Sequence, residues 1–489
     1  MKKVFILIAG LLLVVFIGML VTTMRITNKQ ADYAVIDKAP LPSGALQRFT
    51  DALAIKTISS RDGNFDKDEF DRFNQFLFAA YPQVFSSTGH EVVNQYSHII
   101  KWRGTDPSLE PIILMAHLDV VPIANPGAWS VDPFSEGVKN GVIYGRGAID
   151  NKLGLIGIME AVNSLIAEGF APQRTTYLVF GHDEEVLGLN GAKVMAQQLA
   201  EKNVKAHFIL DEGLPIADRL IPGIDQQVAM IGIAEKGFLS LELQVEYAGG
   251  HSSVPAPDNA ISILSSAVLK VKAQPFKADL NPVIQAFMDE VAPKMGFWTR
   301  FAMANRWLLS PLIIKSYESS ASGNASLRTT IAPTIFQAGV QDNVIPSKAR
   351  AVINFRIIPG QTIAEIINHV VEVIDDDRVV VQALELEEQE PPWFEASAIS
   401  SMDSAGYEII KRSIAEVFAD TLVAPGLLVG ATDSRHLAEL NESAVYRFLP
   451  YVLNDENLNS VHGVDERVTV DGFANAINFY RQVIINANQ

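Results

Sequence analysis

The sequence predicts an α/β fold, in which a mixed, mostly parallel sheet is covered by helices and a smaller α+β domain is inserted into the chain. After residue 45, short apolar runs alternate with helical stretches, an order typical of parallel sheets buried on both faces. From about residue 236, apolar and polar residues alternate instead, which indicates strands with one solvated face. A separate apolar run without charge lies at the N-terminus and predicts a transmembrane helix.

This N-terminal run covers residues 4–24 and follows Lys2 and Lys3. As a helix rising about 1.5 Å per residue, it is long enough for a hydrocarbon core of about 30 Å. A cleavable signal usually has an apolar region of only roughly 7–15 residues, so we expect an uncleaved signal anchor over residues 1–30. The two lysines stay in the cytoplasm under the positive-inside rule, which places the rest of the chain outside. A cleaved signal peptide and a buried core helix are the alternatives.

The first part of the predicted α/β domain covers residues 31–235, and its strands end in acidic residues or histidine. Ligand sites in open α/β sheets lie at the carboxyl ends of strands. These polar strand ends are therefore candidate site residues. The expected strands cover 111–121, 177–185 and 207–213, and the expected helices cover 152–168 and 192–203.

The inserted domain is expected over residues 236–388, after which residues 389–489 complete the α/β domain. The elements of the inserted domain follow the order β-α-β-β-α-β, the split βαβ arrangement. An apolar insertion between about 275 and 330 is expected to be helical. It forms either a lipid-facing or acyl-binding surface, or a packed helical pair at a dimer interface. The expected strands cover 238–249, 334–341, 349–357 and 379–386, and the expected helices cover 258–271 and 362–374.

The composition and motifs of the chain exclude several kinds of partner and of catalytic chemistry. The formal net charge is −17, so the surface would repel a phosphate backbone and no nucleic-acid partner is expected. The chain has no cysteine, and any metal must be held by His, Asp and Glu. The G-x-S-x-G, H-E-x-x-H and P-loop patterns are absent, and Ser434 near His436 lacks the strand-elbow signal of a serine hydrolase.

Histidine and acidic residues gather at the predicted strand ends. His117 and Asp119 are two apart on a strand, which places both side chains on one face. A metal-bound histidine usually has its other ring nitrogen fixed by a carboxylate or carbonyl, a role that suits Asp119. Each cluster alone is typical of a solvated surface, but together they would converge on one rim, where buried like charges require cations. The remaining members are Asp150, Glu184, Glu185, Asp211, Glu212 and His462.

The segments that carry these residues resemble the M20 metallopeptidase family, and within it the carboxypeptidase S and N-acyl-amino-acid hydrolase branch. The resemblance covers about residues 45–489. It implies a catalytic domain with two zinc ions and an inserted lid domain that often mediates dimers, so a homodimer through the lid is one expected assembly. The segments, in order, are AHLDVVP (116–122), YGRGAIDNK (144–152), GHDEEVLGLNGA (181–192), LDEG (210–213), GGHSSVP (249–255), GATDSRH (430–436) and HG (462–463).

The resemblance also implies individual roles. One zinc is held by His117 and the other by His462, and Asp150 bridges both. The fifth ligand is Asp211 or Glu212, because relatives place either an Asp or a Glu at this strand end. The other implied roles are zinc ligand for Glu185, general base for Glu184, orientation of His117 for Asp119, and oxyanion stabilisation for His251.

Further positions resemble substrate contacts. Asn343 and Arg356 lie in the lid, and the arginine could pair bidentately with a substrate carboxylate. Gly430 and Arg435 belong to the loop that receives the same group. The implied activity is zinc-dependent hydrolysis of an amide bond next to a free carboxylate, in a small peptide or an N-acyl amino acid. A membrane-anchored binding protein that has lost catalysis is the alternative, although no expected ligand position is missing.

Overall fold

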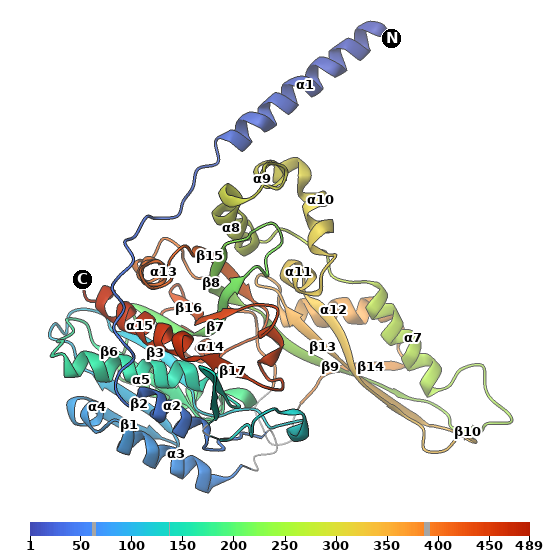
Figure 1. Ribbon diagram of the computed structural model, residues 1–489. Helices are drawn as coiled ribbons and strands as arrows, with labels where there is room; N and C mark the ends of the chain where they lie inside the picture. The colour runs from blue at the N-terminus through green and yellow to red at the C-terminus, as the bar shows by residue number, and fades with distance from the viewer. Residues whose placement is uncertain (61–64, 136, 386–391) are drawn as a thin grey trace.

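The computed structural model describes residues 1–60, 65–135, 137–385 and 392–489 (Figure 1). The predicted strand end at Leu386 and the predicted domain boundary at 388–389 lie outside these residues. A mixed eight-stranded sheet in the order β1-β2-β6-β3-β7-β16-β8-β15 forms the centre of the molecule. Its strands are β1 (Gly89–Val93), β2 (Ser97–Trp102), β3 (Ile112–His117), β6 (Thr176–Gly181), β7 (Phe208–Asp218), β8 (Gln227–Glu235), β15 (Leu422–Leu428) and β16 (Val445–Leu453).

The central sheet is mostly parallel, as the sequence predicts. β3 pairs in parallel with β6 and β7, β7 with β16, and β8 with β15. The strand expected over 207–213 is longer in the structure, because residues 216–218 continue β7 by pairing with β8. Asp211 and Glu212 therefore lie inside a strand and not at its end.

Helices bury both faces of this sheet, which explains why its central strands are continuous apolar runs. Ile112 and Leu114 of β3 belong to one core, whereas Ile113 and Met115 belong to a second core on the other face. This alternation follows from the two-residue period of a strand. The first core includes α5 (Lys152–Ala167), α13 (Ala405–Val417) and α15 (Val470–Asn486), and the second includes α6 (Ala192–Glu201).

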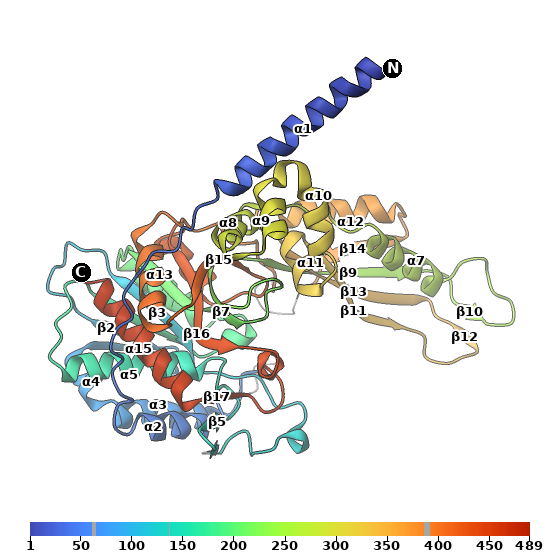
Figure 2. The ribbon, with the colours of Figure 1, turned by 45° about the horizontal axis from the view of Figure 1, so that its top comes forward.

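A second, antiparallel sheet in the order β11-β13-β9-β14 extends away from the first (Figures 1 and 2). Two helices, α7 and α12, pack against it around a core of its own. The chain order β9-α7-β11-β13-α12-β14 is the one that the sequence predicts. The elements are β9 (Gly237–Glu246), α7 (Ala260–Ala273), β11 (Thr330–Ala338), β13 (Lys348–Ile357), α12 (Ile363–Ile374) and β14 (Val379–Ala383).

The apolar insertion is helical, as expected, but its helices do not join the core of the second sheet. Its helices are α8 (Pro282–Val291), α9 (Phe297–Ala304), α10 (Arg306–Tyr317) and α11 (Ala321–Leu327). Met288 and Ile313 of these helices share a core with Leu422 and Ala424 of β15. The insertion therefore packs on the edge of the central sheet. The N-terminal run forms α1 (Lys2–Met24), a helix long and apolar enough to cross a membrane, which projects from the rest of the chain (Figure 1).

Candidate metal centre

Asp150 lies between two histidines that are far apart in the sequence. Its Oδ1 is 2.9 Å from Nε2 of His117, and its Oδ2 is 3.0 Å from Nε2 of His462. Each histidine also faces a second carboxylate: Oε1 of Glu212 is 3.3 Å from Nε2 of His117, and Oε1 of Glu185 is 3.3 Å from Nε2 of His462. The centre thus has two halves, each with one imidazole, one glutamate and one oxygen of the shared aspartate.

The local folds that carry these groups meet at one edge of the central sheet. His117 ends β3, and Asp150 lies in the turn before α5, where Asn151 caps the helix by accepting from the N–H of Gly154. Glu184 and Glu185 form a short 3-10 turn after β6. Candidate ligand atoms lie within 4.8 Å of one another in two groups: His117 with Glu184 and Glu212, and His117 with Asp150 and Glu185.

Asp119 organises this arrangement from a fully buried position. Its carboxylate lies 3.3 Å from Nδ1 of His117, and it accepts hydrogen bonds from the backbone N–H groups of Glu184 and Glu185 and from the hydroxyl of Ser59. Burial acts to raise the pKa of Asp119, but the hydrogen bonds outweigh it and the net shift is downward. The side chain therefore stays ionised, contacts His117 as predicted, and also fixes the turn that holds both glutamates.

The structure separates the two candidates for the fifth ligand. The carboxylate of Asp211 accepts from the backbone N–H of Glu212 through Oδ1 and from that of Ser434 through Oδ2, both at 2.9 Å. Glu212, the next residue along β7, directs its carboxylate at His117 instead. The geometry therefore favours Glu212 as a ligand and gives Asp211 a supporting role between β7 and the 430–436 loop.

The electrostatics of the centre fit a divalent cation. Burial, the largest cause in each case, raises the pKa of Glu184 well above its usual range, that of Glu185 to about 7 and that of Glu212 to about 8. So many carboxylates in one buried site must bind protons or cations. Imidazole nitrogens and carboxylate oxygens suit zinc, so the donor set fits the metal that the sequence implies.

Glu466 and Arg146, for which the sequence predicted no role, connect two of the segments that carry candidate ligands. The buried Glu466 accepts from the N–H groups of Ile149 and Asp150 through Oε1, and its Oε2 is 2.6 Å from Nη1 of Arg146. Arg146 also donates to the backbone carbonyl of His462. The pair therefore joins the turn of one ligand to the loop of another. Arg146 lies within the segment YGRGAIDNK, and this position is the signal that could have identified it.

Asp433, in the GATDSRH segment, is a further site residue that was not predicted from the sequence. Its carboxylate is buried and has no hydrogen-bond partner among the described residues. Burial, which disfavours the charged form, raises the pKa of Asp433 well above the usual range. Gly188 is required beside it, because a Cβ at that position would overlap the carboxylate.

The two predicted carboxylate-binding arginines lie at opposite ends of one aromatic pair. The guanidinium of Arg356 lies 4.7 Å from the ring centroid of Phe238, and that of Arg435 lies 4.6 Å from the ring centroid of Phe394. The two rings are stacked with their centroids 6.0 Å apart. Gly430 lies in an open part of the adjoining loop: apart from its two chain neighbours, no described residue has an atom within 4 Å of where a Cβ would stand.

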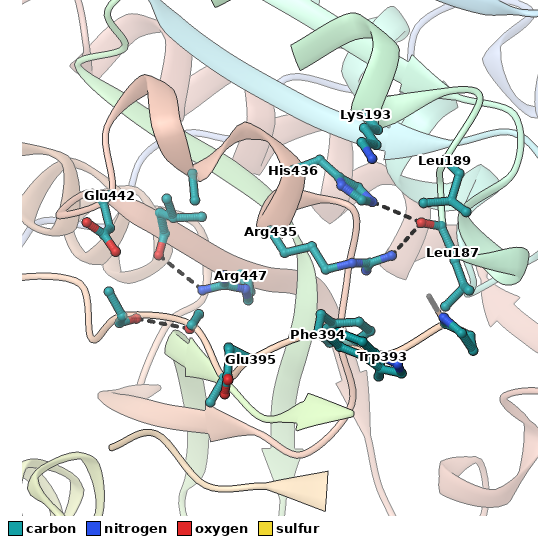
Figure 3. Close-up of a pocket in the computed structure, with 16 residues that line it drawn as sticks. Leu187, Leu189, Lys193, Trp393, Phe394, Glu395, Arg435, His436, Glu442 and Arg447 are labelled. Atoms are coloured by element: carbon teal, nitrogen blue, oxygen red, sulfur yellow. Dashed lines mark hydrogen bonds between the residues drawn. The ribbon is translucent and has the colours of Figure 1, made fainter. Parts of the chain in front are cut away.

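Arg435 also binds backbone, which the sequence did not predict. It donates to the carbonyl oxygen of Thr432 at 2.6 Å and to that of Leu187 at 2.6 Å. His436 contacts the same Leu187 oxygen at 2.9 Å, and Figure 3 shows the two contacts to Leu187. Leu187, Arg435 and His436 line a pocket of about 340 Å³ together with Trp393 and Phe394. Arg435 thereby ties its loop to the turn that carries Glu184 and Glu185.

His251 and Asn343 lie together but away from the metal centre. His251 is exposed on β10 (Gly250–His251), which pairs with β12 (Val344–Ile345). The carbonyl of Asn343 accepts from the N–H of Ser252 in the same region. Figures 1 and 2 show these strands at the far end of the second sheet. Within a single chain in this conformation, neither side chain reaches the His117 cluster.

The fold and the site define a class: hydrolases that hold their metal with imidazole and carboxylate groups at the strand ends of an α/β sheet. The sequence matches the family described as Peptidase family M20/M25/M40 over residues 113–486. The chain belongs to this family and is an M20-type metallopeptidase, which confirms the expectation drawn from its motifs.

Two curated relatives extend along most of the chain. The N-fatty-acyl-amino acid synthase/hydrolase PM20D1 of Xenopus tropicalis is 40% identical over 441 residues, covering 89% of this chain and 84% of its own. The probable carboxypeptidase S-like 2 of Dictyostelium discoideum is 36% identical over 496 residues, covering 99% and 94%.

Two solved structures share the fold. The M20 family metallo-carboxypeptidase Sso-CP2 from Sulfolobus solfataricus has a TM-score of 0.67 at 17% identity and covers 91% of this chain and 100% of its own. Human carnosine dipeptidase 1 has a TM-score of 0.59 at 13% identity and covers 91% and 97%. At these identities the likeness concerns the fold alone.

Proposed function

We propose that this chain is a two-zinc amidohydrolase that cleaves the amide bond of N-acyl amino acids bearing a free carboxylate. The observation that carries the proposal is the position of Asp150 between His117 and His462, each of which faces a glutamate of its own. His117 and Glu212 would hold one ion, His462 and Glu185 the other, and Asp150 both. All the expected donor positions are present, which disfavours a binding protein that has lost catalysis.

We assign the proton transfer in this hydrolysis to Glu184. When bound, zinc supplies Lewis acidity and lowers the pKa of an attacking water. Glu184 is positioned by the hydrogen bond from its backbone N–H to Asp119, and its carboxylate lies close to the imidazole of His117 and the carboxylate of Glu212. A carboxylate whose pKa is raised by burial is suited to take a proton from water and pass it to the leaving amine.

The relatives favour two related substrates. The Xenopus relative is named for N-fatty-acyl amino acids, which supports an acyl amino acid as the first candidate. The Dictyostelium relative is named a probable carboxypeptidase and is similar over 99% of this chain, α1 included, which supports a peptide cut at its C-terminus as the second. Both have an amide bond next to a free carboxylate.

A substrate panel tests the proposal. The full-length protein, purified with zinc, should hydrolyse N-long-chain-acyl amino acids faster than N-acetyl amino acids and dipeptides. It should contain close to two metal ions per chain and lose activity on chelation. A faster dipeptide reaction would favour the carboxypeptidase. A metal content near zero, with activity unaffected by chelators, would refute the two-zinc site.

Arg356 is proposed to bind the free carboxylate of the substrate. Replacing it by Ala should lower kcat/KM by about 10- to 150-fold, the equivalent of the roughly 1.5–3 kcal/mol of one charged hydrogen bond. Arg356→Lys keeps the charge without the planar fork and should recover only part of the loss. Wild type should prefer free acids to amidated substrates, and Arg356→Ala should lose most of this preference.

Arg350, on the same strand, provides the matched control, because it pairs with Glu242 of β9. Arg350→Ala should keep the preference for free acids. Equal discrimination by wild type and Arg356→Ala would mean that the carboxylate is recognised elsewhere and that Arg356, which packs on Phe238, has a structural role.

The oxyanion role of His251 requires movement or a second chain, because the side chain is exposed and distant from the centre. We propose that it comes from the lid of a partner in a homodimer. Mixing His251→Ala chains with Glu184→Gln chains should then restore part of the activity that each variant lacks, since one site of the mixed dimer would be complete. Absence of any recovery in a verified mixed dimer would favour closure within one chain.

We further propose that α1 is an uncleaved anchor and that the remaining chain lies on the extracytoplasmic side. The helix has 23 residues, and apart from Met19 and Thr23 its side chains are not buried by the rest of the chain. Its basic residues at the N-terminus, Lys2 and Lys3, are retained in the cytoplasm by the positive-inside rule. Recovery of a mature chain that begins near residue 26–30 would show a cleaved signal instead.

A further inference from the structure

Helices α9 and α10 expose large apolar side chains close to α1. Trp298, Trp307 and Leu312 are 72%, 68% and 63% exposed, and Phe297 and Leu308 are also exposed. We call these five residues the α9–α10 face. Leu308 and Leu312 are four residues apart on α10, so they lie on the same side of the helix. Soluble surfaces seldom carry so many large apolar groups in one place, which indicates a contact with an apolar partner.

Asn305 connects the α9–α10 region to α1 through hydrogen bonds. This fully buried side chain donates to the carbonyl of Met19 at 3.1 Å and to the hydroxyl of Thr23 at 3.2 Å, and it accepts from the hydroxyl of Thr22 at 2.7 Å. An uncompensated amide would be costly in an apolar environment, and here its donors and acceptor have partners. The α9–α10 face is therefore held at a fixed position along α1 (Figure 2).

The contact reaches well into the apolar part of α1. The ring of Phe301 on α9 lies 6.0 Å from that of Phe16. Phe16 is eight positions before Met24, which corresponds to about 12 Å along a helix axis. The 23 residues of α1 span about 35 Å, whereas a hydrocarbon core is about 30 Å thick, so α1 has little length to spare. If α1 spans the bilayer, Phe301 lies within its outer half.

The charges around the face also suit a lipid surface. Between residues 294 and 317 the chain has four basic residues and no acidic one, although its net charge is −17. Tryptophan and basic side chains are enriched where proteins meet the headgroup region of a bilayer. The basic residues are Lys294, Arg300, Arg306 and Lys315, of which Arg306 also pairs with Asp289 of α8 at 2.6 Å.

We propose that the α9–α10 face inserts into the lipid leaflet on the catalytic side of the membrane, beside α1. The inference rests on the proposed anchor, because the depth of Phe301 is measured against α1. A second copy of the chain is the competing occupant. The lipid is favoured because the face adjoins, and is bonded to, the segment that enters the bilayer.

The absence of cysteine from the chain allows a direct test with single labelled cysteines. Full-length Leu312→Cys would carry an environment-sensitive fluorophore on the face, and Leu11→Cys would carry it on α1. Val340→Cys, at a residue 94% exposed between β11 and β12, is the matched aqueous control. Each protein is reconstituted into phosphatidylcholine vesicles that contain a minor fraction of phosphatidylglycerol.

The Leu312 and Leu11 probes should be quenched several-fold more strongly by spin-labelled lipid than the Val340 probe, and should be shielded from aqueous iodide. A Leu312 probe open to iodide, with the Leu11 probe in lipid, would overturn the proposal and leave the anchor intact. A Leu312 probe shielded from both quenchers would overturn it in favour of a second chain. A Leu11 probe in water would overturn both proposals. Trp298→Cys repeats the measurement on α9, in case the label at Leu312 disturbs α10.

Discussion

Glu184→Gln is expected to lower kcat by a factor on the order of 10²–10⁴ or more, the usual contribution of a general base. The amide keeps the shape of the side chain but cannot accept the proton. The backbone bond to Asp119 does not involve the side chain, so the turn should keep its position. Metal content and KM should therefore stay close to those of the wild type, and steady-state kinetics with metal analysis checks both.

Glu185→Gln provides the contrast, because its side chain faces His462 and Asp150 and not the proposed path of the proton. This variant should lose metal occupancy, and added zinc should restore part of its activity. Added zinc should not rescue Glu184→Gln. A near-normal kcat in metal-loaded Glu184→Gln would show that another group acts as the base.

The sequence predicts those parts of the metal centre that follow from the two-residue period of a strand and from the positions of the strand ends. The sequence places His117 and Asp119 two apart on one strand; in the structure β3 ends at His117 and Asp119 follows it, but the two side chains are in contact as the pattern predicts. Glu184 and Glu185 follow β6 and meet His117 because parallel strands end at the same edge of a sheet. These relations are local or follow from fold class, so a single sequence suffices for them.

Relations that depend on tertiary detail were not predictable. The choice between Asp211 and Glu212 depends on how β7 continues past the site to pair with β8, a feature that no local pattern shows. The distance of His251 from the centre depends on how the second sheet is placed against the first. The bonds of Asn305 to α1 join segments 282 to 286 residues apart.

The role of Glu466 could not be predicted from the sequence either, because a carboxylate near the end of a loop is usually exposed to solvent. Here it is fully buried and collects four donors: Nη1 of Arg146 and the backbone N–H groups of Gly147, Ile149 and Asp150. Its function in the fold is to close the 147–150 turn. That turn presents the two oxygens of Asp150 to the two histidines, so the geometry of the metal site depends on it.

Glu466→Gln is accordingly expected to lower the free energy of unfolding by about 3–5 kcal/mol, the usual cost of removing one partner from a buried ion pair. The amide nitrogen would face donors, and the guanidinium of Arg146 would be buried without a counter-charge. The metal content should fall as well, because the turn of Asp150 and the loop of His462 are both held by this pair. Denaturant unfolding and metal analysis measure the two effects.

Glu91→Gln is the matched control for this change. Glu91 pairs with Lys202 at 2.5 Å, but the two side chains are 53% and 45% exposed. Solvent-exposed pairs contribute about 0–1 kcal/mol, because water screens them and ordering two long side chains costs entropy. The control should therefore unfold almost like the wild type and keep its metal. If both variants changed stability by the same small amount, Glu466 would be dispensable and the position of Asp150 would have to be fixed by the metal itself.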